Sequence, residues 1–150
     1  MEISEDYRDL FKILNAHKIR YLIVGAYAVS FYTEPRFTKD IDVWVKPDID
    51  NAKKLYNALV AFGAPLKEVK IEDFTNEKTV YQIGVAPVRI DIIMGLGDLK
   101  FDKTWKSHVK TKYGGISVQM IGKNDLIHSK DLAKRSQDTL DLKKLTREKK

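Results

Sequence analysis

The sequence contains no cysteine among its 150 residues. Disulfide bonds, zinc sites built from thiolates and cysteine nucleophiles are therefore all excluded. It also has no apolar run approaching the 18 residues typical of a membrane span, and its acidic N-terminus, MEISED, is unlike a signal peptide. We therefore expect a cytoplasmic protein with no membrane partner.

Two catalytic signatures are absent as well. Neither the G-x-S-x-G pattern of serine hydrolases nor the P-loop of Walker NTPases occurs. The three histidines, His17, His108 and His128, are isolated and lack the spacing of metal ligands. No internal repeat or low-complexity linker divides the chain. These absences disfavour serine hydrolases, Walker NTPases and histidine metal centres.

Length and composition suit a single folded domain. The hydrophobic content of 43% provides a core, and the charged content of 32% provides a well-solvated surface. The charge is unevenly placed, because residues 1–100 carry 14 basic and 15 acidic side chains whereas residues 101–150 carry 13 basic and 6 acidic ones. A basic C-terminal third would attract nucleic acid, a nucleoside triphosphate or an acidic partner. A solvated helix end is the alternative explanation for the cations of residues 143–150.

Hydrophobic periodicity and turn residues predict an α+β fold. Helices are expected at residues 4–17, 26–32, 48–62, 98–108, 123–134 and 136–147, with a helical turn at 71–74. Strands are expected at residues 20–24, 40–45, 79–84, 88–93, 109–112 and 116–121. This order predicts a small mixed sheet with helices packed on one side of it. We expect one domain over residues 1–150, with an α/β core at 1–121 and a helical segment at 122–150.

The segment from Tyr21 to Val45 carries the strongest functional signal. Its first strand ends at Gly25, and a strand–turn–helix of this kind presents backbone N–H groups that can bind phosphate. Asp40 and Asp42 open the next strand and, being two residues apart, project from the same face. Adjacent carboxylates repel one another, and a divalent cation with oxygen ligands is their natural partner. A solvated strand end carrying two exposed acids is the alternative.

A third carboxylate, Asp91, interrupts the otherwise apolar strand 88–93. Burying an unpaired carboxylate is costly, so this side chain requires a metal ion or a cationic partner. Arg89 lies two residues earlier and therefore shares the face of Asp91. A purely structural Arg89–Asp91 ion pair is the alternative to a metal site.

Together these features resemble the nucleotidyltransferase superfamily, whose fold is that of the DNA polymerase β palm. The family pattern is a hydrophobic residue and Gly followed by Gly or Ser, then Asp-hydrophobic-Asp, and later a strand with a single Asp between hydrophobic residues. In this chain the pattern falls on Val24-Gly25-Ala26, Asp40-Ile41-Asp42 and Ile90-Asp91-Ile92. Ala26 departs from this pattern, which has Gly or Ser at that position. The resemblance implies that the hydroxyl of a serine there would contact the triphosphate.

Two further stretches are similar to the AbiEii-type toxin branch of minimal nucleotidyltransferases. One is the loop Pro35-Arg36-Phe37-Thr38-Lys39, which precedes the paired acids. The other is a K-x4-R-x2-D-x2-D run, formed by Lys130, Arg135, Asp138 and Asp141. The resemblance covers about residues 18–145.

The resemblance implies transfer of a nucleoside monophosphate from an NTP such as ATP to a hydroxyl of a protein or RNA, tRNA included. It implies two Mg²⁺ ions, with Mn²⁺ as the substitute, held by the catalytic residues Asp40, Asp42 and Asp91. It implies nucleotide binding by Gly25, Ala26, Arg36, Thr38, Lys39, Lys130 and Arg135. The similarity to the AbiEii-type branch extends the expectation to a toxin–antitoxin pair with a cognate partner.

Two other functions compete with this one. The first is a nucleotidyltransferase fold that has lost catalysis and acts as a binding partner or antitoxin. The second is a basic nucleic-acid-binding module whose acids are structural. The presence of all three aspartates favours the active enzyme over the first alternative. A binding module gives no reason to cluster acids beside a glycine turn, which disfavours the second.

Overall fold

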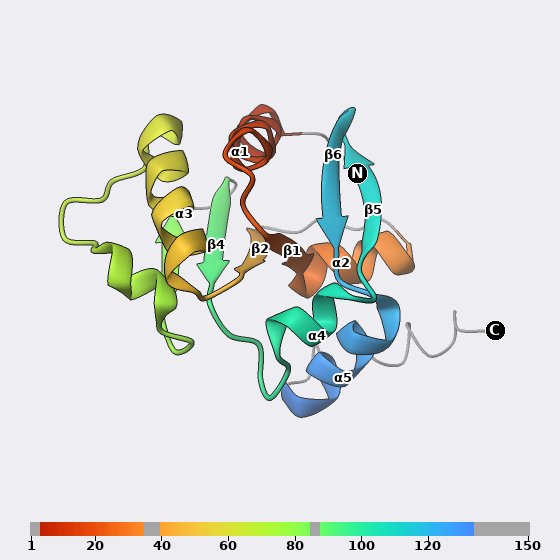
Figure 1. Ribbon diagram of the computed structural model, residues 1–150. Coiled ribbons are helices and arrows are strands. Elements are labelled where there is room, and N and C mark those ends of the chain that lie inside the picture. The colour runs from red at the N-terminus through yellow and green to blue at the C-terminus, as the bar shows by residue number, and fades with distance from the viewer. Residues whose placement is uncertain (1–3, 35–39, 85–87, 134–150) are drawn as a thin grey trace.

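The structure, a computed structural model, describes residues 4–34, 40–84 and 88–133 (Figure 1). The helices within these ranges are α1 (Glu5–Ala16), α2 (Gly25–Tyr32), α3 (Ile49–Phe62), the 3-10 helix η1 (Ile71–Thr75), α4 (Phe101–Trp105) and α5 (Lys123–Ala133). The strands are β1 (Tyr21–Val24), β2 (Asp40–Val45), β3 (Val80–Ile83), β4 (Arg89–Ile93), β5 (Val109–Tyr113) and β6 (Ile116–Met120). Of the helices described, none combines the length and the apolarity needed to cross a bilayer.

The strands form one mixed sheet in the order β3-β4-β2-β1-β6-β5, which confirms the expected α+β fold. Strand β1 pairs antiparallel with β2 and parallel with β6. Strand β2 pairs parallel with β4, while the hairpins β3–β4 and β5–β6 are antiparallel. The two strands that carry the candidate acids, β2 and β4, are therefore immediate neighbours.

Local capping residues mark the start of α1 and both ends of α3. Helix α1 begins after Ser4, whose hydroxyl accepts a hydrogen bond of 3.3 Å from the backbone N–H of Tyr7. Helix α3 begins after Asp48, whose carboxylate accepts a hydrogen bond of 2.8 Å from the backbone N–H of Asn51. It ends at Gly63, which has the left-handed φ of 89° that glycine adopts without strain.

The helix expected over residues 98–108 is shorter than predicted, because α4 covers only Phe101–Trp105. Before it, the N–H of Leu99 donates to the carbonyl of Leu96 in a turn, so the helix cannot begin at residue 98. After it, Ser107 donates three residues back to Thr104, which ends the helix in a tighter turn. The helix expected at residues 136–147 lies outside the described residues.

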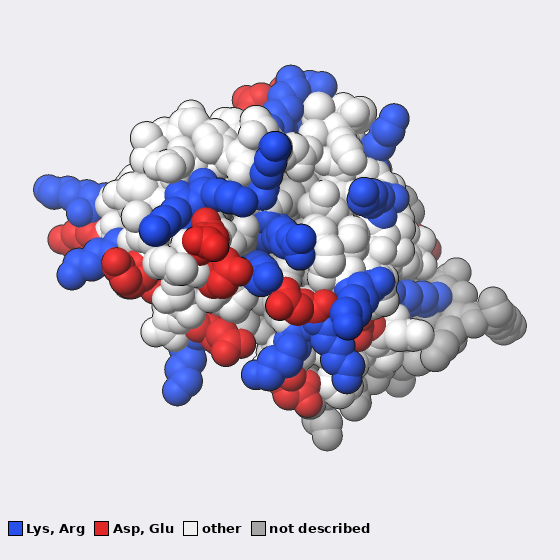
Figure 2. Space-filling view, viewed as in Figure 1, with Lys and Arg blue, Asp and Glu red and all other residues white. Residues whose placement is uncertain are grey.

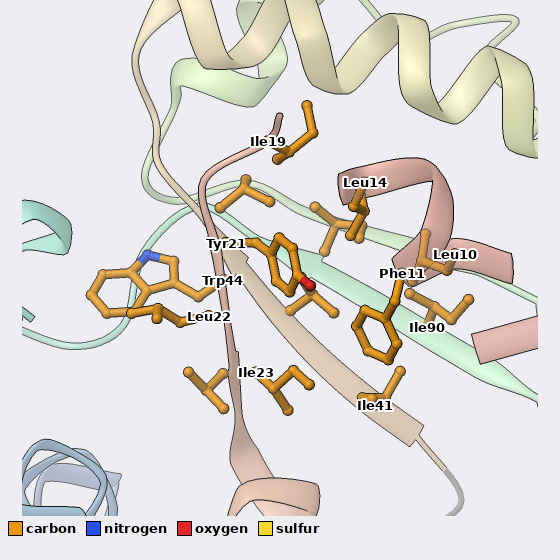
Figure 3. Packing of buried hydrophobic residues seen from close by; sticks show 14 of the residues in the cluster. Leu10, Phe11, Leu14, Ile19, Tyr21, Leu22, Ile23, Ile41, Trp44 and Ile90 are labelled. Atoms are coloured by element: carbon orange, nitrogen blue, oxygen red, sulfur yellow. The ribbon is translucent and has the colours of Figure 1, made fainter. Parts of the chain in front are cut away.

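Helices lie on both faces of the sheet, so the expectation of one covered face is wrong. Phe11 of α1 stacks on Tyr21 with ring centroids 5.9 Å apart, and Phe101 of α4 meets Trp44 edge-on at 5.1 Å. Figure 3 shows Tyr21 and Phe11 on one side of β1, and Leu22 and Trp44 on the other. The physical reason is that all four residues of β1 are apolar and buried, which requires cover on both faces.

Candidate active site

The register between β2 and β4 gathers the candidate acids. Asp42 is paired with Asp91 and Asp40 with Arg89, and paired residues of neighbouring strands point to the same face. Carboxylate oxygens of Asp40, Asp42 and Asp91 all lie within 4.8 Å of one another. The intervening Ile41 is fully buried, as its alternation with the acids predicts. Residues far apart in the chain thus form one carboxylate cluster, defined as Asp40, Asp42 and Asp91.

Burial and mutual repulsion make the charged state of this cluster costly. Asp91 is buried, with 6% of its surface exposed, while Asp40 and Asp42 are half-buried. Burial, followed by the charges of Asp40 and Asp91, raises the pKa of Asp42 to about 7. Burial, followed by the charge of Asp91, also raises the pKa of Asp40. Three carboxylates with this electrostatic cost are the hard oxygen donors that a divalent cation such as Mg²⁺ requires, so the residues present fit the metal.

Arg89 contacts two members of the cluster. Its Nε donates a hydrogen bond of 3.1 Å to Oδ1 of Asp91, and its Nη2 donates one of 3.0 Å to Oδ2. The same Nε lies 3.8 Å from Oδ2 of Asp40. The Arg89–Asp91 ion pair, which the sequence offered as the alternative to a metal site, is therefore present in the structure. It occurs together with the carboxylate cluster and does not replace it.

Gly25 lies directly against Asp42. Its φ of 69° is in the left-handed region, and a Cβ built on it would stand 2.1 Å from Oδ2 of Asp42. Glycine is needed here both for its backbone conformation and for the space that the carboxylate takes. Helix α2 begins at this residue, and its N-cap, Val24, offers no side chain to the N–H groups of the first turn. The strand–turn–helix expected from the sequence is therefore present, and phosphate binding by its N–H groups and by Ala26 stays a prediction.

Of the basic candidates, Lys130 is the one within the described residues. It lies on α5 with 8% of its surface exposed, and its positive charge lowers the pKa of Asp42. The remaining nucleotide-binding candidates lie outside the described residues: Arg36, Thr38, Lys39 and Arg135. The structure therefore brings Gly25 and Lys130 close to Asp42, and nucleotide binding by all seven candidates stays a prediction.

One neighbour of the site has no functional signal in the sequence. The hydroxyl of Tyr7 donates a hydrogen bond of 3.0 Å to the backbone carbonyl of Arg89. Burial, followed by Tyr113 and then Asp40, raises the pKa of Tyr7 to about 12. The hydrophobic periodicity of α1 predicts only that Tyr7 is a core residue. Periodicity does not reveal which group the hydroxyl of a buried tyrosine contacts.

Comparisons with known proteins agree with this geometry. A family model described as nucleotidyl transferase of unknown function (DUF2204) matches residues 3–150. No curated protein sequence matches the chain. The lincosamide antibiotic adenylyltransferase LnuA, solved with bound lincomycin, superposes with a TM-score of 0.60 at 16% identity, covering 97% of this chain and 98% of that one.

Two other solved structures are similar. A protein from Thermotoga maritima proposed to be a nucleotidyltransferase has a TM-score of 0.64 at 14% identity, covering 99% of this chain and 97% of its own. The antibiotic-resistance factor ANT(2'')-Ia has a TM-score of 0.63 at 12% identity, covering 93% of this chain and 80% of its own. At these identities the likeness establishes the fold.

Proposed function

Because the chain belongs to the family of nucleotidyl transferases of unknown function, DUF2204, we propose that it transfers a nucleoside monophosphate from an NTP to a hydroxyl group. Asp40, Asp42 and Asp91 are the proposed catalytic carboxylates. The observation that carries the proposal is their convergence within 4.8 Å beside a left-handed glycine that opens a helix. Each feature alone has a structural explanation, but together they provide a metal-binding cluster next to a phosphate-binding turn.

The reaction has a defined balance of bonds. The acceptor oxygen bonds to the α-phosphorus of the NTP, and the bond from that phosphorus to the bridging oxygen of the β-phosphate breaks. Pyrophosphate leaves with the electron pair, and the acceptor hydroxyl loses its proton to solvent. Two Mg²⁺ ions, or Mn²⁺ in their place, would supply stabilisation of the charge on the attacking and leaving oxygens.

The residues of this chain have separate roles in the proposal. Asp40 and Asp42 would hold the ion that binds the nucleotide, and Asp91 would complete the site for the ion that activates the acceptor. The N–H groups that follow Gly25 orient the β- and γ-phosphates. Lys130 supplies positive charge from α5, and its burial keeps that charge fixed in position.

The acceptor in this proposal is a hydroxyl of a protein or an RNA, tRNA included, and the protein acts in a toxin–antitoxin pair with a cognate partner. The similar LnuA is an antibiotic adenylyltransferase. This likeness supports including small hydroxylated molecules among the acceptors that are tested.

A second candidate is a catalytically degenerate protein that binds nucleotide or a partner. Two observations favour it: Arg89 donates to both oxygens of Asp91, and Ala26 stands where the family pattern has Gly or Ser. A basic nucleic-acid-binding module has less support. On the face shown in Figure 2, basic side chains are interleaved with acidic ones, and the described residues form no continuous basic patch there.

Substitution of Asp42 by Asn tests the proposal. Asp42→Asn keeps the shape but removes a metal-binding charge, so we expect transfer to fall by more than about 100-fold, since even residues behind a metal ligand cost 10–100-fold. The protein should stay folded, because repulsion within the cluster is relieved. The assay incubates purified protein with each α-labelled NTP, Mg²⁺ and total tRNA, the product of a neighbouring gene or small hydroxylated molecules.

Asp50→Asn is the matched control, because Asp50 is exposed on α3, and it should transfer like the wild type. Equal transfer by wild type and Asp42→Asn would show that the cluster is not catalytic. If the wild type binds Mg²⁺-NTP but transfers to no acceptor, and Asp42→Asn does not bind, the degenerate binder replaces the enzyme.

A further inference from the structure

Arg89 places a positive charge at the carboxylate cluster, where a metal ion would bind. Its bidentate contact uses both oxygens of Asp91. The side chain of Asp91 is 9% exposed, whereas that of Arg89 is 40% exposed. Asp91 is therefore enclosed by protein, while the guanidinium of Arg89 borders solvent. Of the two, the arginine is the partner that could leave the pair without being buried elsewhere.

A divalent cation and Arg89 neutralise the same carboxylates. Each carboxylate oxygen has two lone pairs and can accept a hydrogen bond while it binds a metal ion, so the two cations do not compete for lone pairs. They compete through charge. The guanidinium contacts Asp91 and lies 3.8 Å from Asp40, so its positive charge would repel an ion bound between these carboxylates.

We propose that Arg89 is an internal counter-cation, which neutralises Asp91 while the site is without metal and leaves it when a divalent ion binds. This inference rests on the proposed metal site of the nucleotidyltransferase. Arg89 is a positioning residue, because it acts on the metal through Asp91 and Asp40. Without it, the buried carboxylate of Asp91 would face its neighbouring acids without a cationic partner, and an uncompensated buried charge is strongly destabilising.

A coupling between metal and nucleotide follows from the proposal. An arginine released from Asp91 is a bidentate donor of the kind that phosphates bind well. A triphosphate beside the cluster therefore favours the released position, which also takes the positive charge of Arg89 away from the metal site. Nucleotide should raise metal affinity in the wild type, and by linkage metal should raise nucleotide affinity by the same factor.

Metal binding without nucleotide separates this role from a purely structural one. We expect Arg89→Gln to bind Mn²⁺ roughly tenfold or more tightly than the wild type, because a unit charge a few ångströms from the ion has been removed. Free Mn²⁺ measured by electron paramagnetic resonance gives the affinity. The metal-free variant should melt at a lower temperature than the wild type, and Mn²⁺ should raise its melting temperature by more.

The matched control is Arg8→Gln, which removes an arginine paired with Glu5 at 3.0 Å on α1, away from the cluster. It should leave Mn²⁺ affinity unchanged. If Arg89→Gln cannot be purified, Arg89→Lys replaces the bidentate contact by a single ammonium, and a several-fold gain in Mn²⁺ affinity is expected.

Two results separate the failure of this inference from that of the proposed function. Mn²⁺ binding that is lost in Asp42→Asn but unchanged or weaker in the Arg89 variants would overturn the counter-cation and leave the metal site standing. Mn²⁺ binding that is the same in wild type, Asp42→Asn and Arg89→Gln would overturn the metal site, and the counter-cation with it. A wild type that binds no Mn²⁺ beside an Arg89→Gln that binds it would support the inference.

Discussion

Burial, neighbouring charges and a close contact with Gly25 all act on the side chain of Asp42. Burial and the charges of Asp40 and Asp91 raise its pKa, and the charge of Lys130 opposes them. The side chain also lies against Gly25, which leaves it no room to turn toward that side. A carboxyl group with a pKa of about 7 changes its charge within the neutral range, so proton and metal compete for it at the pH of most assays.

This competition predicts the sign of the pH dependence. Between pH 3.8 and about 7, Asp42 is protonated in the folded protein and ionised in the unfolded chain, so unfolding releases a proton. In a chelator, stability should therefore fall as the pH rises from about 5 to 7, and change little above that. Melting temperatures followed by circular dichroism check this. Asp42→Asn should flatten the profile, and an unchanged slope in that variant would assign the effect to other groups.

At the scale of the element, the turn from β1 into α2 connects the sheet to the site. The left-handed Gly25 ends the strand, begins the helix and makes space for the carboxylate of β2. An apolar strand that ends at a glycine is common in αβ units, and the close approach of Asp42 distinguishes this one. The turn and the acids therefore form one structural unit.

Gly25→Ala should damage binding more than it damages folding. The left-handed conformation costs a residue with a Cβ about 1–2 kcal/mol. The new Cβ must also displace Asp42, because a Cβ built at this position would stand 2.1 Å from Oδ2 of Asp42. Gly63→Ala is the matched control, because Gly63 has a φ of 89° and nothing within 4 Å of a built Cβ. Urea unfolding should show a loss of stability for both variants, with the larger loss for Gly25→Ala because its Cβ must also displace the carboxylate. Calorimetry should show weaker Mg²⁺-NTP binding for Gly25→Ala alone. Equal binding by both variants would show that the Gly25 turn and its approach to Asp42 do not contribute to nucleotide binding.

At the scale of the whole molecule, the site combines segments from along most of the described chain. Strand β2 supplies Asp40 and Asp42, β4 supplies Asp91 and Arg89, and α5 supplies Lys130. The division into a core at 1–121 and a helical segment at 122–150 stays a prediction. The effect of Lys130 on Asp42 nevertheless means that the C-terminal segment contributes to the electrostatics of the cluster.

Lys130→Met should test this long-range contribution. Loss of the buried positive charge should raise the pKa of Asp42 further and weaken Mg²⁺-NTP binding by roughly tenfold, the scale of one charge-assisted contact. Lys123→Met makes the same change in charge in the first turn of α5 and should leave binding unchanged. Calorimetry at pH 8, where Asp42 is mostly ionised, provides the comparison. Equal Mg²⁺-NTP affinity of the two variants would show that the charge of Lys130 does not contribute to nucleotide binding.

The sequence by itself determined the features that depend on near neighbours. Alternation along a strand put Asp40 and Asp42 on one face, and capping residues set the ends of α1 and α3. The family was also accessible, because the glycine turn and the three aspartates occur in recognisable order, and the match over residues 3–150 confirms it. These features need only a few consecutive residues, whose steric and hydrogen-bonding preferences hold in any fold.

Only the tertiary structure decided how distant segments meet. The parallel pairing of β2 with β4 brings Asp91 opposite Asp42, and no local pattern states that register. The same pairing decides that Arg89 reaches both Asp91 and Asp40, where the sequence allowed either an ion pair or a metal site. Helix α4 packs Phe101 on Trp44 over the second face of the sheet, which periodicity alone did not reveal. The pairing register of the strands and the placement of helices on each face of the sheet are set by the packing of the whole core. Each depends on contacts between residues far apart in the chain.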